Sequence, residues 1–311
     1  MSTSDDVAQR AGDTTGSPAP SAVHAGSGIS GSGLTLGELE RSRLGELEST
    51  EAAAVFDVRE FARTARGSHR AELDLAGLEG ARLEPDAARL LGVLRDLERS
   101  TMQRMRNLLV TATHKDARVT AFLSTWAFEK FWLADALDAV LDTTASQPPV
   151  EDGPKRRDRR ERAARRGPVR RAVLANFAGA DIVGVHVTSG LVDEWITQAA
   201  YRRLAAAAEK LGSIAQLALD VKERHLAFLQ EDARRRLADS TRVQKLARTE
   251  LTQQAWPIGS IERPDAERGF FERMVFGGAA GRREAGGIRE LIAALPGLAA
   301  VAPVVEARLA R

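Results

Sequence analysis

Four segments of helical hydrophobic periodicity, each about 25 residues or longer, constrain the fold of this 311-residue chain most strongly. They lie within 85–108, 115–142, 181–210 and 213–238, and no convincing strand-like alternation of apolar and polar residues is found. Helices of this length exceed the average of globular proteins, and they bury their apolar stripes against one another. Because a long crossover joins them as two pairs, the sequence predicts an all-α protein built on a four-helix bundle.

Composition predicts how the remaining segments are organised. Residues 1–33 are rich in Ser, Gly, Thr and Ala and nearly lack large apolar side chains, so we expect a disordered N-terminal tail. Residues 34–84 are expected to form an N-terminal helical extension. The bundle covers 85–252 and includes a crossover loop at 146–171. Residues 253–311 are expected to add short helices that pack on the bundle.

Two pairs of residues have the Ser/Thr-x-x-Gln spacing of a helix-capping box. Ser213 with Gln216 predicts the start of the fourth long helix. Thr241 with Gln244 predicts the start of a shorter helix after it.

Composition and missing motifs exclude several function classes. The chain has no cysteine and five histidines, which excludes disulfides, thiol nucleophiles, cysteine-ligated zinc and iron–sulfur clusters. No glycine-rich phosphate loop follows a strand-like segment. The N-terminus lacks the pattern of a secretory signal, and the longest apolar run, 291–305, is too short to span a bilayer. We therefore expect a cytoplasmic protein.

Each long helical segment places one ionisable side chain near the middle of its apolar stripe. These side chains are Glu98, Lys130, Glu194 and Lys222. An isolated buried charge is costly, so the four groups are expected to contact one another or a metal. Glu98 precedes Lys130 by 32 residues, and Glu194 precedes Lys222 by 28. This similar spacing indicates that one helix pair repeats the other.

Several segments resemble a known family. The segment FLSTWAFEKFWLADALDAVL at 122–141, the segments GVHVTSGLVDEW, AAYRRLAAAAE and KERHLAFLQEDARRRL from Gly184 onward, and WPIGS further on are similar to actinobacterial proteins related to acyl-carrier-protein desaturases. These belong to the ferritin-like superfamily. The resemblance covers roughly residues 85–300. It implies an all-α ferritin-like bundle and, in active members, a di-iron site that uses O₂ to desaturate or oxidise an acyl chain.

The ligand pattern of that family is only half present. Active members supply a Glu from the first and third core helices and Glu-x-x-His from the second and fourth. Glu98 and Glu194 match the lone glutamates, and His225 matches the final histidine. The positions that depart from the pattern are Lys130, Leu133 and Lys222. The resemblance therefore implies a degenerate dimetal site.

Charge balance explains the departure. Two carboxylates facing two ammonium groups are neutral with no metal, and two unit charges about 4 Å apart repel an incoming cation by roughly 4 kcal/mol at an effective dielectric near 20. We therefore expect a metal-free bundle without a cofactor, cross-linked by Glu98, Lys130, Glu194 and Lys222, with His225 hydrogen-bonded into the network. Which lysine meets which glutamate is left open. Such a protein is expected to be a non-catalytic binding or scaffold protein.

One alternative keeps a metal. A shifted register brings in Glu129, so that Glu98, Glu129, Glu194 and His225 would hold a single iron or manganese ion. With such a site, or with a di-iron site, the chain would be an O₂-dependent acyl desaturase or oxidase. The chain would then be a metal-dependent oxidoreductase, and this alternative remains open.

A second alternative rests on a basic segment at 155–171. It has ten basic and two acidic residues, a net charge of +8 in a chain whose total is +2, so the remainder carries −6. The basic residues are Lys155, Arg156, Arg157, Arg159, Arg160, Arg162, Arg165, Arg166, Arg170 and Arg171. The segment is either a solvated linker or a docking patch for an acidic protein, such as an acyl carrier protein, or for an anionic membrane. It contains no aromatic residue to stack on bases, which argues against nucleic acid. A homodimer also remains open.

Overall fold

The structure is a computed structural model that describes residues 55–145, 179–260 and 263–310. Every regular element within these ranges is a helix, which confirms the all-α prediction. The predicted N-terminal tail, residues 34–54 of the predicted extension and the crossover loop at 146–171 lie outside the described residues. Among the described helices, none combines the length and the apolar character needed to cross a bilayer.

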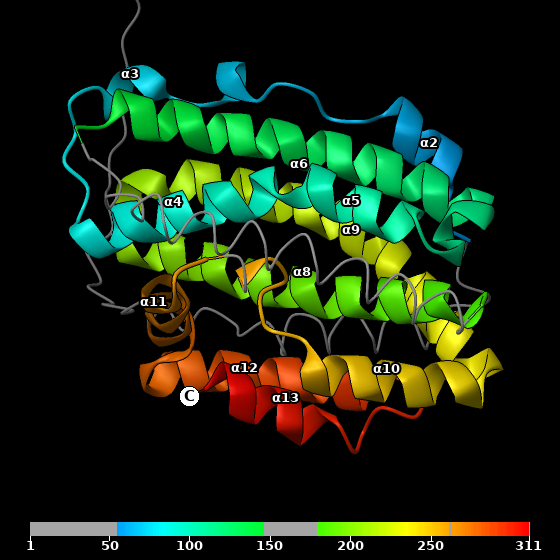
Figure 1. Ribbon diagram of the computed structural model, residues 1–311. Helices are drawn as coiled ribbons and strands as arrows, with labels where there is room; N and C mark the ends of the chain where they lie inside the picture. The colour runs from blue at the N-terminus through cyan, green and yellow to red at the C-terminus, as the bar shows by residue number, and fades with distance from the viewer. Residues whose placement is uncertain (1–54, 146–178, 261–262, 311) are drawn as a thin grey trace, which may run out of the picture. The chain divides into compact units, whose positions relative to one another are not determined.

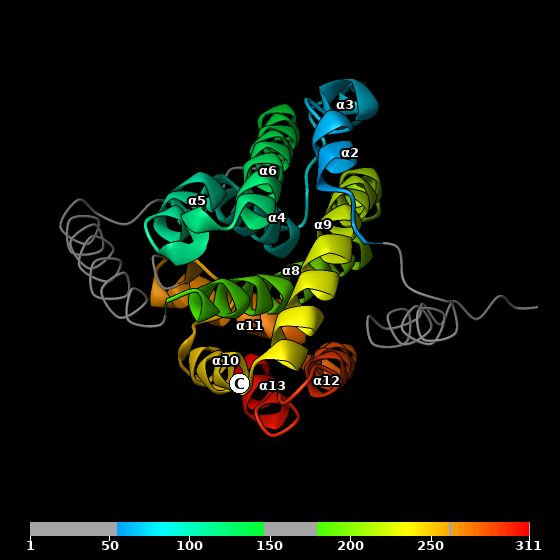
Figure 2. The ribbon, with the colours of Figure 1, turned by 90° about the vertical axis from the view of Figure 1, so that its right-hand side faces the viewer.

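Two antiparallel helix pairs form the interior (Figure 1). In the first pair, α4 (Pro85–Arg99) packs on α6 (Ala117–Thr143). The second pair is a hairpin of α8 (Asp181–Ala207) and α9 (Gly212–Asp239) over a short 3₁₀ turn. Because α4 also contacts α8 and α6 also contacts α9, the four helices close around one interior (Figure 2).

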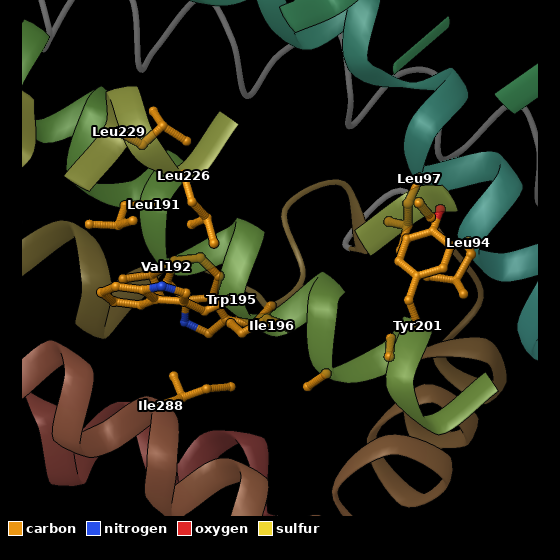
Figure 3. Close-up of a cluster of buried hydrophobic side chains, with 14 of the residues drawn as sticks. Leu94, Leu97, Leu191, Val192, Trp195, Ile196, Tyr201, Leu226, Leu229 and Ile288 are labelled. Carbon is orange, nitrogen blue, oxygen red and sulfur yellow. The ribbon is translucent and has the colours of Figure 1, made fainter. Parts of the chain in front are cut away.

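Large apolar side chains pack on more than one side of α8 (Figure 3). Those of the α8–α9 hairpin are Leu191, Val192, Trp195, Ile196, Leu226 and Leu229. Ile288 of the later helix α12 (Gly278–Ala293) reaches α8 from the other side, and Tyr201 lies beside Leu94 and Leu97 of α4. Helix α8 is thus buried on more than one face, since every residue from 187 to 201 is buried.

The first long helix is broken. The periodicity over 85–108 predicted one helix, but α4 ends at Arg99 and α5 covers Thr101–Leu109. The Ser100 hydroxyl donates to the Leu97 carbonyl at 2.8 Å, a side-chain bond that competes with regular helix geometry. A loop also reaches this point, because a Cβ added at Gly259 would lie 3.2 Å from Ser100 Oγ.

Both predicted capping boxes are wrong. Helix α9 begins at Gly212, so Ser213 lies inside its first turn, and no side chain caps this end. Helix α10 (Thr241–Gln253) is capped by Ser240, whose Oγ accepts from Val243 N at 3.2 Å. Gln244 instead donates to the Leu237 carbonyl. The serine one residue earlier holds the cap because it has the extended backbone that an N-cap requires.

Shorter helices flank the interior. Helices α2 (Val58–Arg63) and α3 (Leu75–Leu78) precede α4 and contact α6. Helices α11 (Asp265–Phe276), α12 (Gly278–Ala293) and α13 (Ala302–Leu309) end the chain.

The junction between α11 and α12 depends on glycine. A Cβ at Gly281 would lie 2.3 Å from the carbonyl carbon of Phe276, so only glycine allows these two helices to approach so closely. Helices α10, α11 and α12 all contact α8, which leaves α8 covered on several sides.

Candidate functional site

Four charged side chains meet inside the protein, one from each long helix. They are Glu98 from α4, Lys130 from α6, Glu194 from α8 and Lys222 from α9. None is more than 3% exposed. Lys130, Glu194 and Lys222 stand near the middle of their helices, whereas Glu98 is the second-last residue of α4. All four lie among apolar neighbours, and helix packing therefore holds them out of water.

The four groups form a closed ring of alternating charge, which we call the tetrad. Lys130 Nζ lies 3.0 Å from Glu98 Oε2 and 3.1 Å from Glu194 Oε1. Lys222 Nζ lies 2.9 Å from Glu98 Oε1 and 2.8 Å from Glu194 Oε2. Each lysine therefore contacts both glutamates, and each carboxylate offers one oxygen to each lysine.

Two aromatic side chains also contact the tetrad. The Tyr201 hydroxyl donates to Glu98 Oε1 at 3.1 Å, and the Trp126 indole N–H donates to Glu194 Oε1 at 2.8 Å. The same rings also face the ammonium groups. Lys222 Nζ is 5.5 Å from the Tyr201 ring centroid, and Lys130 Nζ is 4.9 Å from the centroid of Trp126. Each half of the tetrad thus has one aromatic donor that also serves as a cation–π partner.

Electrostatics favour the charged forms of Glu98, Glu194 and Lys222. Burial alone would raise the pKa of Glu194, but attraction to Lys130 and Lys222 outweighs burial and holds this pKa well below its usual range. The pKa of Glu98 is lowered for the same reasons. Burial opposes the charge on Lys222, yet Glu194 and Glu98 raise its pKa above the usual value. Burial and the adjacent Glu98 carboxylate raise the pKa of Tyr201 well above its usual value, so its phenol stays a donor.

His225 lies next to the tetrad but is not hydrogen-bonded to it. Its Nδ1 is 3.7 Å from Glu194 Oε1 and has no hydrogen-bond partner, whereas its Nε2 lies 2.9 Å from Glu129 Oε2. The expected bond into the tetrad is therefore replaced by a bond to Glu129. This glutamate precedes Lys130 by one residue, a rotation of about 100° around α6, and it faces α9 instead of the tetrad.

Glu129 is a second buried carboxylate with its own partners. Its Oε1 accepts from the Arg66 backbone N–H at 2.8 Å and lies 3.1 Å from Arg224 Nη2. Burial raises its pKa, but His225, the Arg66 N–H and Arg224 outweigh burial, and the net pKa is lowered. Glu129 thus ties the segment before α3 to α6 and α9.

The residues do not fit a metal. Within 55–145, 179–260 and 263–310, no group of three or more His, Asp or Glu side chains is arranged to hold an ion. Of the alternative ligand set, Glu98 and Glu194 are both bridged by lysine ammonium groups, and Glu129 is turned towards His225. An incoming cation would have to displace an ammonium group from its two carboxylates.

Sequence reasoning missed two parts of the site. Trp126 lies one turn before Lys130, and the hydrogen bond that its indole N–H donates to Glu194 was not predicted. The sequence placed Glu129 and His225 together only as alternative metal ligands, and it did not predict the direct bond between them across α6 and α9. The basic side chains at 155–171 lie outside the described residues.

Comparison with known proteins assigns no family to this chain. No family model, no curated protein and no solved structure matches this chain.

Proposed function

We propose that this chain is a metal-free, ferritin-like protein related to acyl-carrier-protein desaturases, and that it acts as a cytoplasmic binding or scaffold protein instead of an enzyme. The observation that carries the proposal is the tetrad, in which two ammonium groups stand between two carboxylates. The cycle of contacts among α4, α6, α8 and α9 supports a ferritin-like four-helix bundle.

The charge balance of the tetrad supports a metal-free interior. Every carboxylate oxygen of Glu98 and Glu194 lies within 3.1 Å of a lysine Nζ. The positive charge that a dimetal centre would supply is thus provided by side chains. Removing one member of a buried ion network costs several kcal/mol, so a metal ion that displaced a lysine would bind against that cost.

A scaffold function also needs a partner. The net charge of +8 at 155–171 favours an acidic protein as that partner, with long-range attraction steering the encounter. Binding through this segment is expected to weaken as ionic strength rises.

Elemental analysis tests the proposal. The full chain is expressed with added iron and manganese, desalted, and analysed by mass spectrometry of the elements. We expect far less than one ion per chain. One or two retained ions would contradict the metal-free assignment and favour the O₂-dependent oxidase.

A reverted variant sharpens this test. Lys130→Glu, Lys222→Glu and Leu133→His together restore the ligand pattern of active desaturases, and the variant is expected to gain iron. The matched control, Lys130→Met with Lys222→Met, removes the ammonium groups without adding ligands and is expected to stay metal-free. A reverted variant that folds and still binds no metal would show that these positions are not the old ligand sites.

A further inference from the structure

Helix α6 exposes aromatic side chains on its outer face. Among the described residues, the phenylalanines that stand out into solvent are Phe128 and Phe131, at 44% and 52% of full exposure. They lie less than one turn apart, and both rings contact Trp132, at centroid distances of 6.3 and 5.3 Å. Single exposed apolar side chains are common, but aromatic rings gathered on one helix face are typical of a protein interface.

The exposed positions of α6 have the spacing of a coiled-coil seam. Between residues 117 and 134, the exposed side chains follow one another at steps of four, three, four and three residues. They are Ala117, Ala121, Ser124, Phe128 and Phe131. Steps that alternate between three and four keep a stripe on one side of a helix over several turns. We call this stripe the α6 seam.

The α6 seam carries no charge, whereas a helix face that ends in water normally does. Its one polar side chain, Ser124, donates its hydroxyl to the Thr120 carbonyl of the same helix at 3.0 Å. Charged positions begin beyond the seam at Asp135, which pairs with Arg70 of the same chain. The seam is about 22 Å long.

The neighbouring helices leave the α6 seam open. Helix α5 packs on one side of α6, and α2 and α3 pack on the other (Figure 2). Since all five seam residues stay exposed, no described part of the chain covers them.

The sizes of the side chains favour a second copy of this chain as the partner. The first three seam positions are small and the last two are large. When two copies pack antiparallel about a two-fold axis between positions 124 and 128, Phe128 faces the partner's Ser124 and Phe131 faces the partner's Ala121. Each layer then combines a large and a small side chain, which keeps the two helices at one separation. Parallel packing would place phenylalanine on phenylalanine and alanine on alanine, and the separation would have to change along the seam.

We propose that two copies of this chain form an antiparallel, two-fold symmetric dimer through the α6 seam. The same stripe supplies both the protruding rings and the small residues that receive them, as a self-complementary interface requires. The inference goes beyond the proposed function and does not depend on the metal content of the tetrad. Because the seam is smaller than a standard protein interface, we expect a dissociation constant in the micromolar range.

Sedimentation velocity of the full chain across micromolar concentrations tests the dimer. We expect the sedimentation coefficient to rise with concentration towards that of a dimer. Phe128→Glu and Phe131→Glu each bury a carboxylate without a partner in the interface, and each is expected to raise the dissociation constant tenfold or more. Since both side chains are exposed in the single chain, the urea midpoint of the dilute protein is expected to stay unchanged.

The matched control is Val304→Glu on α13. Val304 is 44% exposed, so this variant adds the same charge at an equally exposed apolar position, and its dissociation constant is expected to equal that of wild type. A chain that is monomeric at every concentration would overturn the proposal and leave the α6 seam to another part of this chain or to a different protein. A dimer that persists in both phenylalanine variants would place the interface elsewhere.

Spin labels measure the orientation of the two copies. The chain has no cysteine, so Lys115→Cys carries a single nitroxide label just before α6. In the antiparallel dimer the two labels are expected about 30–35 Å apart, as measured by double electron–electron resonance. Labels about 10 Å apart would indicate parallel helices and overturn the antiparallel arrangement.

Discussion

At the scale of single residues, the tetrad makes each of its charges depend on the others. Replacing Lys222 by methionine leaves Glu98 and Glu194 to share one ammonium group in a site that water does not reach. Breaking a buried ion network in this way costs about 3–5 kcal/mol. We expect the free energy of unfolding of Lys222→Met, measured by urea denaturation, to fall by that amount.

The control for this substitution is an exposed lysine. Lys245 lies on the surface of α10, so Lys245→Met is expected to change the free energy of unfolding by less than about 0.5 kcal/mol. A Lys222→Met protein as stable as wild type would show that the tetrad does not contribute to the fold.

The residues of the tetrad were predictable, but their geometry was not. A charge in the middle of an apolar stripe is a local pattern, and such a pattern can be recognised from spacing alone. The partner of each charge depends on the rotation of four helices against one another. That rotation decides that Lys130 reaches both glutamates, and that His225 faces Glu129 instead of Glu194.

At the scale of elements, the segment before α3 is held against α6 and α9 by polar contacts around Glu129. Arg224 Nη2 donates to the Thr64 carbonyl at 3.0 Å, in addition to its contact with Glu129. Phe61 packs on Phe122, with ring centroids 5.5 Å apart. Glu129→Gln keeps an acceptor for the Arg66 N–H but loses the charge that strengthens the bonds to Arg224 and His225.

We expect Glu129→Gln to loosen residues 55–72 locally. Hydrogen bonds to charged groups contribute about 1.5–3 kcal/mol, so amide exchange at Arg66 is expected to speed up by roughly tenfold or more. Hydrogen-exchange mass spectrometry measures this change. Glu60→Gln is the control, because the Glu60 side chain is 49% exposed and its contact with the exposed Arg63 is expected to contribute little. Faster amide exchange spread evenly over α8 and α9 would show that the effect of Glu129→Gln is not confined to residues 55–72.

Element boundaries show where local sequence signals stop being sufficient. The long helices follow from periodicity, and the structure places α6 within two residues of the predicted 115–142. The break at Ser100 has no proline or glycine to announce it. It coincides with the approach of the loop at Gly259, 159 residues further along the chain, which no local pattern encodes.

At the scale of the whole molecule, the lowered carboxyl pKa values predict how stability depends on pH. The pKa values of Glu98, Glu129 and Glu194 are all lower in the folded protein than their ordinary values. A group of this kind stabilises the fold above its unfolded pKa of about 4.3, and this stabilisation is lost as pH falls towards the folded pKa. The raised pKa of Lys222 acts at the other end, since its contribution is lost as pH rises past about 10.4.

His186 adds an earlier step on the acid side. Its pKa falls from 6.5 to about 4 on folding, so the unfolded chain takes up a proton in this interval and the folded protein does not. We therefore expect the urea midpoint to decline first between about pH 6.5 and 4, and then more steeply below about pH 4.3 as the carboxylates titrate. His186→Gln removes the first decline and keeps the second, whereas Lys222→Met weakens the second and keeps the first. A single acid transition, unchanged in both variants, would mean that neither His186 nor Lys222 controls the acid stability of this protein.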